Sequence, residues 1–142
     1  MERRFIVSFV VAKISLRLCQ VKVDDFMTKE VETADEKTSV ARIAGIMGRQ
    51  RIGSIIISHE GEPFGIFTER DLLTAFLAQD KDLLTAVGKE SSQPLIMIPT
   101  GTSIHRAAAT MAVKHIRRLP IVKDDKLIGI ITARDLVEAY AK

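Results

Sequence analysis

The sequence predicts an α/β fold built from two copies of one structural unit. The string Gly65–Asp71 (Gly-Ile-Phe-Thr-Glu-Arg-Asp) returns 64 residues later as Gly129–Asp135 (Gly-Ile-Ile-Thr-Ala-Arg-Asp). The offset holds without a gap over about forty residues, which indicates an internal repeat rather than a chance match. Further identical pairs at this offset are Thr38 and Thr102, Ser39 and Ser103, Arg42 and Arg106, and Met47 and Met111. Two copies are too few for a solenoid and fit one pseudo-symmetric domain.

Each copy shows the same order of elements: strand, helix, strand, strand, helix. Helical spacing of apolar residues, β-rich runs and turn residues predict this order. In the first copy we expect a strand at 31–34, a helix at 39–49, strands at 52–58 and 64–67, and a helix from Thr68 that buries Leu72, Leu73, Phe76 and Leu77. In the second copy we expect a strand at 95–98, a helix at 103–115, strands at 118–122 and 127–131, and a helix from Thr132.

The segments in front of the two copies are predicted to differ. Each contains a helical turn, at 21–27 and at 82–87. The polar stretch Gly88–Pro94 that follows the second turn looks about four residues longer than its counterpart Thr28–Glu30, which marks it as a loop that closes over a bound molecule.

The chain divides into an N-terminal extension (1–20), a first repeat (21–80) and a second repeat (81–142). Alternating apolar and polar residues predict a strand within 5–18. The apolar run at 5–12 is far shorter than the ~20 residues of a membrane span, so no association with the membrane is expected.

Composition narrows the classes of function. The chain has 142 residues, 46% of them hydrophobic and 27% charged, as one soluble domain would. Its net charge of +3 suits an anionic small ligand as well as a nucleic acid. A single cysteine predicts a reducing compartment, and we expect the cytoplasm. The low aromatic content argues against a platform for stacking nucleic-acid bases.

The repeated string has the chemistry of a phosphate site. It places a glycine near a strand end and then the first turn of a helix, whose free N–H groups and positive dipole end favour anions. Thr68 adds a hydroxyl donor and Arg70 a positive charge. The carboxylate of Asp71 can accept hydrogen bonds from the two hydroxyls of a ribose. Together these groups predict a nucleoside phosphate as ligand.

A structural explanation stands beside this one. Thr-x-x-Asp is close to a capping box, in which Thr68 caps the helix and Asp71 reaches back to its N–H. Capping requires neither the glycine nor the arginine of the string, and both recur in the second copy. We therefore expect the string to bind a ligand as well as to cap its helix.

The motif Gly-hydrophobic-x-Thr-x-x-Asp, twice, each time after a helix that starts at Thr-Ser and a β-rich hairpin, resembles a pair of CBS domains. These tandem repeats are named after cystathionine beta-synthase, and a pair is often called a Bateman module. Asp24–Thr28 and Arg118–Val122 resemble the family as well. The resemblance covers 21–142 and implies an α/β fold, in which each repeat is a three-stranded sheet with two helices and the two repeats pack sheet to sheet.

The resemblance also implies two ligand clefts, each shared between the repeats. One would be lined by Thr68, Arg70, Asp71, Ile96, Ile116, Arg117 and Arg118. The other would be lined by Thr132, Arg134, Asp135, Val31, Ile52, Gly53 and Ser54. Thr28, the Ser91-Ser92 loop and His115 are further candidates, the first two at the edge of the base and the third at a phosphate. The cleft with Arg117 and Arg118 is the more cationic, and we expect it to take the more highly phosphorylated ligand or to bind first.

By the same resemblance the ligand is AMP, ADP or ATP, ahead of S-adenosylmethionine. The protein would form a homodimer and regulate a separate, unknown protein, since no catalytic or transport domain accompanies the repeats. No nucleophile is paired with a base, so we expect neither an enzyme nor a catalytic cofactor. His59, His105 and His115 lack the spacing of metal ligands, so no metal is expected.

A different class of function stays open. The repeats could form a structural scaffold whose basic face binds a partner protein or a nucleic acid. The sequence has no nucleic-acid motif, which counts against the second of these. Affinity for RNA or DNA that falls steeply with salt would favour this alternative over a nucleotide sensor.

Overall fold

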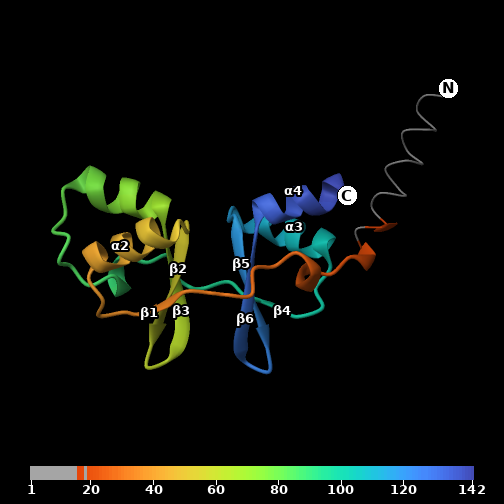
Figure 1. Cartoon of the computed structure of the whole chain (residues 1–142), viewed down its shortest axis with the longest axis horizontal. Coiled ribbons are helices and arrows are strands. Elements are labelled where there is room, and N and C mark those ends of the chain that lie inside the picture. Colours follow the sequence, from red (N-terminus) through yellow and green to blue (C-terminus); the bar gives the residue numbers. More distant parts are fainter. Residues whose placement is uncertain (1–15, 18) are drawn as a thin grey trace. The chain divides into compact units, whose positions relative to one another are not determined.

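The computed structural model describes residues 16, 17 and 19–142 (Figure 1). Residues 16 and 17 are helical, so the strand predicted within 5–18 does not extend to them. The rest of that prediction lies outside the described residues.

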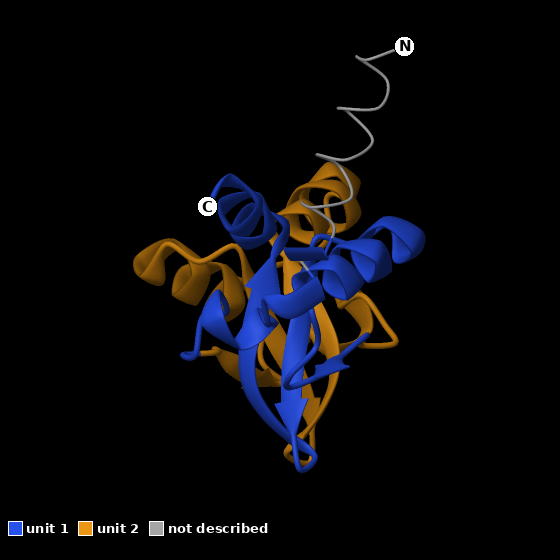
Figure 2. Ribbon diagram, turned by 90° about the vertical axis from the view of Figure 1, so that its right-hand side faces the viewer, with its two compact units in different colours: residues 1–30, 96–142 blue, residues 31–95 orange. Residues whose placement is uncertain are grey.

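The chain forms two compact units, drawn in two colours in Figure 2. Unit 2 is the continuous stretch Val31–Leu95, whereas unit 1 combines the described part of Met1–Glu30 with Ile96–Lys142. Each unit holds a three-stranded sheet. The predicted α/β fold of two similar repeats is confirmed.

Unit 2 begins with a parallel pair of strands joined through a helix. Strand β1 (Thr33–Asp35) pairs with β2 (Ser54–His59), and helix α2 (Val40–Gln50) connects them. Strand β2 then pairs antiparallel with β3 (Glu62–Thr68). Helix α2 starts where predicted, because the Ser39 side chain accepts a hydrogen bond from the Arg42 N–H at 3.2 Å. Short helical segments follow: η2 (Asp71–Phe76), η3 (Leu77–Gln79) and η4 (Gly88–Glu90).

Unit 1 repeats this topology. Its elements are η1 (Val23–Asp25), β4 (Ile98–Pro99), α3 (Ile104–Lys114), β5 (Arg118–Lys123), β6 (Lys126–Thr132) and α4 (Ala133–Ala141). Strand β4 runs parallel to β5, and β5 runs antiparallel to β6. Ser103 caps α3 as Ser39 caps α2. The first strand of each repeat starts later than predicted, by two residues at β1 and by three at β4.

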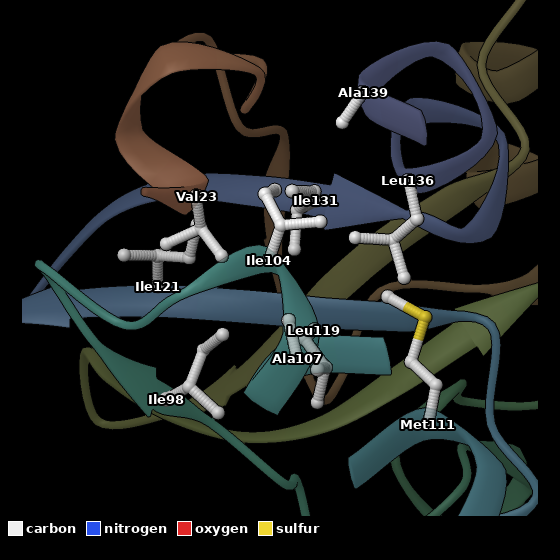
Figure 3. Close-up of a cluster of buried hydrophobic side chains, with 10 residues drawn as sticks. All are labelled: Val23, Ile98, Ile104, Ala107, Met111, Leu119, Ile121, Ile131, Leu136 and Ala139. Carbon is white, nitrogen blue, oxygen red and sulfur yellow. The ribbon is translucent and has the colours of Figure 1, made fainter. Parts of the chain in front are cut away.

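Each unit has its own apolar core, and the segment in front of the other repeat completes it. Figure 3 shows the unit 1 core, in which Val23 of η1 lies among side chains from the strands and helices of the second repeat. Val87 has the equivalent place in the unit 2 core, and both valines are fully buried. Burying a valine contributes about 1.5–3 kcal/mol.

Backbone hydrogen bonds confirm that these two segments are equivalent. The N–H of Val23 donates to the Thr102 oxygen at 2.9 Å, and the N–H of Val87 donates to the Thr38 oxygen at 2.8 Å. Both pairs obey the 64-residue offset, which therefore continues through 21–30 and 85–94. The prediction of a longer loop at Gly88–Pro94 was wrong. By the 64-residue offset its counterpart is 24–30, which has the same length, whereas the prediction compared it with Thr28–Glu30 alone. This stretch is also not an unpaired loop, because the backbone of Ser92 pairs with β3.

The last helical segments of the two repeats differ in winding. Helix α4 is a regular α-helix that buries Leu136 and Ala139. Its counterpart η2 is a π-helix that buries Phe76 instead of Ala75. The wider π turn moves the inward position on by one residue and admits the larger side chain.

This winding also corrects the predicted apolar face of the helix after Thr68. Leu72 packs against the core and Phe76 is buried, but Leu73 is 60% exposed and Leu77 is 48% exposed. The prediction used α-helical spacing, which η2 does not follow.

An acidic side chain anchors η1 to the second repeat. The Thr100 hydroxyl and the Gly101 N–H both donate to the Asp24 carboxylate, the latter at 2.8 Å. The Thr100 hydrogen bond is the main cause that holds the pKa of Asp24 below its ordinary value of 3.8, against the opposing effect of desolvation.

We expect this anchor to weaken in acid. Because the folded-state pKa of Asp24 is depressed, its stabilisation is present above the unfolded pKa and is lost as pH falls through the folded pKa. Urea unfolding of the wild type and of Asp24→Asn checks this. The wild type should be the more stable at pH 6, and the difference should shrink below about pH 4. A difference that stays constant over this range would contradict the assignment.

Candidate functional site

The candidate site of unit 2 lies where β3 ends and the following helical segment begins. The N–H and the hydroxyl of Thr68 donate to Asp71 Oδ2 at 2.9 and 3.1 Å. In return the Asp71 N–H donates to Thr68 Oγ1 at 3.2 Å. Both side chains are half-buried.

The candidate site of unit 1 repeats this geometry at the end of β6. Asp135 Oδ2 accepts from the Thr132 N–H at 2.8 Å and from the Thr132 hydroxyl at 3.0 Å. The Asp135 N–H donates to Thr132 Oγ1 at 3.3 Å. The capping role is thus confirmed in both repeats. The capping hydrogen bonds use only Oδ2 of each carboxylate and leave Oδ1 to other partners.

The glycine of each string has a packing role that the sequence did not reveal. A Cβ on Gly65 would lie 2.6 Å from Ser91 Oγ and 3.2 Å from the Ser92 oxygen. A Cβ on Gly129 would meet Met27 Sδ and lie 3.1 Å from the Thr28 oxygen. The glycines therefore let the preceding segment cross the strand closely. Their recurrence does not by itself indicate a ligand.

The two arginines of the strings are exposed. Arg134 lies 3.7 Å from Glu138 in an ion pair between two largely exposed side chains. Such a pair adds little stability. Each arginine lies one residue before the aspartate, where its positive charge can attract an anion that binds at the start of the helix.

The structure places different residues beside the two threonines. Ser54 pairs with Thr68 across β2 and β3, and the Gly53 oxygen accepts from the Glu69 N–H at 3.1 Å. In unit 1 the equivalent partners are basic: Arg118 pairs with Thr132, and the Arg117 oxygen accepts from the Ala133 N–H at 2.8 Å.

The structure thus brings Arg117 and Arg118 next to Thr132 along the backbone. It brings Gly53 and Ser54 next to Thr68. The predicted clefts combine these residues the other way round, across the two repeats, and that combination stays a prediction.

Several other predicted site residues have structural roles. Ile52, Ile96 and Ile116 pack against the cores of their units. His115 ends α3 in the left-handed conformation with its side chain exposed. Val31 is half-buried at the start of unit 2.

The segments that cross the strands supply two more predicted residues. The backbone of Thr28 pairs with Ile130 in unit 1, and the backbone of Ser92 pairs with Ile66 in unit 2. The side chain of Ser92 also reaches Asp71, with Oγ 3.1 Å from Oδ1. The sequence predicted Ser92 only at the edge of the base. Its contact with Asp71 arises because two segments cross, and no local sequence pattern predicts it.

Among residues 16, 17 and 19–142, no group of three histidine, cysteine or acidic side chains is arranged to hold a metal ion. Within the same residues, no helix combines the length and the apolar character that crossing a membrane needs.

Comparison with known proteins identifies the relatives of this chain. An uncharacterised protein of Methanopyrus kandleri is 37% identical over 121 residues, which make up 83% of this chain and 62% of that protein. A CBS domain-containing protein of Bacillus subtilis is 33% identical over 114 residues, or 80% of this chain and 81% of that protein. This chain thus spans less than two thirds of the Methanopyrus protein.

A solved structure is similar over most of both chains. It is the CBS domain pair of protein MJ0100 in complex with 5′-methylthioadenosine and S-adenosyl-L-methionine. The TM-score is 0.76 at 26% identity, over 84% of this chain and 99% of the other. The CBS domain model itself matches residues 23–78 and 81–142. This chain therefore belongs to the CBS domain family and carries two CBS domains.

Proposed function

We propose that this CBS-domain pair binds a ligand that contains adenosine, and that it acts as a non-catalytic sensor for a separate protein. The observation that carries the proposal is the Thr–Asp pair at the start of a helix in each unit, in which the capping hydrogen bonds use only one of the two carboxylate oxygens. A free carboxylate oxygen accepts ribose hydroxyls, and the N-terminus favours phosphate.

The similar CBS pair in complex with 5′-methylthioadenosine and S-adenosyl-L-methionine supports the adenosine part of this proposal. In our proposal each ligand lies between a Thr–Asp pair of one repeat and the backbone of the other. Thr68, Arg70 and Asp71 act with Ile96 and 116–118 in one site. Thr132, Arg134 and Asp135 act with Val31 and 52–54 in the other. AMP, ADP and ATP are the preferred ligands, because arginines stand next to both aspartates.

The proposal includes self-association. The last helical segments of the two repeats expose apolar side chains: Leu73 and Leu77 on η2 and η3, and Val137 and Tyr140 on α4. A homodimer would remove this apolar surface from water. Sedimentation analysis with and without nucleotide tests whether a dimer forms and whether the ligand changes it.

Isothermal titration calorimetry tests the binding itself. We expect AMP, ADP, ATP, S-adenosylmethionine or 5′-methylthioadenosine to bind, with at most two sites per chain. GMP serves as the control, because it keeps the ribose and phosphate but changes the base. Absence of binding by all five adenosine compounds at millimolar concentration would refute the proposal. Equal binding of GMP would show that the site recognises ribose and phosphate only.

A further inference from the structure

The two Thr–Asp pairs differ in one contact. Ser92 donates its hydroxyl to Asp71, with Oγ 3.1 Å from Oδ1 and 3.4 Å from Oδ2. The residue at the equivalent position in unit 1 is Thr28, whose backbone pairs with β6 as that of Ser92 pairs with β3. Among the described residues, no side chain donates to Asp135 Oδ1.

This contact changes how many hydrogen bonds each carboxylate can still accept. An ionised carboxylate has about four acceptor positions, two on each oxygen. In both units the threonine N–H and hydroxyl occupy the two positions on Oδ2. Asp135 therefore keeps two positions on Oδ1. Asp71 keeps one, because Ser92 takes the other.

A ribose presents two neighbouring hydroxyl donors. Asp135 can accept both of them. Asp71 can accept only one unless the Ser92 hydroxyl turns away, so one ribose hydroxyl goes without this partner. Ser92 is exposed, and its backbone rather than its side chain pairs with β3, so removing its hydroxyl should leave the fold intact.

We infer that Ser92 sets the ribose specificity of the Asp71 site by competing with the ligand for the carboxylate. The inference rests on the proposed function, since it concerns the same two aspartates. The Asp135 site is then the one that distinguishes ribose from deoxyribose, and it binds its ligand before the Asp71 site does. This order is opposite to the one expected from Arg117 and Arg118 alone.

Site-resolved NMR titration of the full chain tests the inference. AMP and 5′-methylthioadenosine, each beside its 2′-deoxy form, are titrated while the amide signals of 68–71 and 132–135 are followed separately. At Asp135 the deoxy form should bind about tenfold more weakly, the effect of one hydrogen bond to a charged group. At Asp71 the loss should stay below about threefold, because the remaining hydroxyl takes the single free position.

Two variants of Ser92 complete the experiment. Ser92→Ala should raise the discrimination at Asp71 to about tenfold, matching that at Asp135. Ser92→Thr keeps a hydroxyl and should retain the weak discrimination of the wild type. Thr110→Ala removes a hydroxyl from helix α3, where it donates to the Arg106 oxygen, and controls for a general effect of losing a hydroxyl.

The outcomes separate this inference from the function on which it rests. If none of the five adenosine compounds of the calorimetric test binds, the proposed function fails and the inference fails with it. If both sites bind but discriminate equally in the wild type, only the inference is overturned. It is also overturned if Ser92→Ala leaves the discrimination at Asp71 unchanged.

Discussion

Replacing Asp135 by asparagine is expected to weaken nucleotide binding in one site by about tenfold to a hundredfold while the fold stays intact. The carboxylate charge strengthens hydrogen bonds from ribose hydroxyls, and a hydrogen bond to a charged group contributes about 1.5–3 kcal/mol. Asparagine keeps a side-chain oxygen that can accept the hydrogen bonds from the Thr132 N–H and hydroxyl, so stability should change by less than about 1 kcal/mol. Calorimetry with AMP and thermal unfolding measure the two effects on the same protein.

A cap elsewhere in unit 1 provides the matched control. The Ser103 side chain accepts a hydrogen bond from the Arg106 N–H at 3.1 Å and caps α3, and it belongs to neither predicted cleft. Ser103→Ala should cost about 1 kcal/mol of stability and leave binding unchanged. If Asp135→Asn binds AMP like the wild type, Asp135 is only a helix cap. Asp71→Asn repeats the test in unit 2.

A methyl group at Gly65 should destabilise the protein by about 1–3 kcal/mol, the usual cost of overpacking. The new Cβ would lie 2.6 Å from Ser91 Oγ, which is itself fixed by donating to the Gly88 oxygen at 2.7 Å. Gly129→Ala should be milder, because the atom in its way is the sulfur of the flexible Met27 side chain. Urea unfolding of both variants measures the order.

Gly48 is the control for these two variants. It lies in helix α2 with nothing within 4 Å of a Cβ, so Gly48→Ala should raise stability by about 0.5–1 kcal/mol. If Gly65→Ala is as stable as the wild type, the close crossing does not explain the glycine. That result would favour the other explanation, in which Gly65 lets a ligand approach the backbone closely.

Much of the fold could be predicted because its signals are local. The helices that were expected to start at Ser39 and Ser103 do so, and the two β-hairpins have the predicted order. The winding of η2 could not be predicted, because the preference for Phe76 over Ala75 depends on the space in the core. The same limit applies to the segments at 21–30 and 85–94. Val23 and Val87 are the only identical pair in these segments, which is too weak a signal to align them.

The candidate site was predicted in part. The pairing of Thr68 with Asp71 and of Thr132 with Asp135 is confirmed, because a spacing of three at a helix start determines it. The contact between Ser92 and Asp71 joins residues 21 positions apart and required the structure. The reason for Gly65 also lay outside the string, in the segment that crosses it.

The segment in front of each repeat completes the core of the other repeat, so cutting the chain between the repeats should leave both cores incomplete. A fragment ending at Asp80 carries Val23 but lacks Val87, and the complementary fragment from Lys81 carries Val87 but lacks Val23. Each fragment holds the piece that the other needs, so neither has a complete core alone, and we expect that mixing the two restores both.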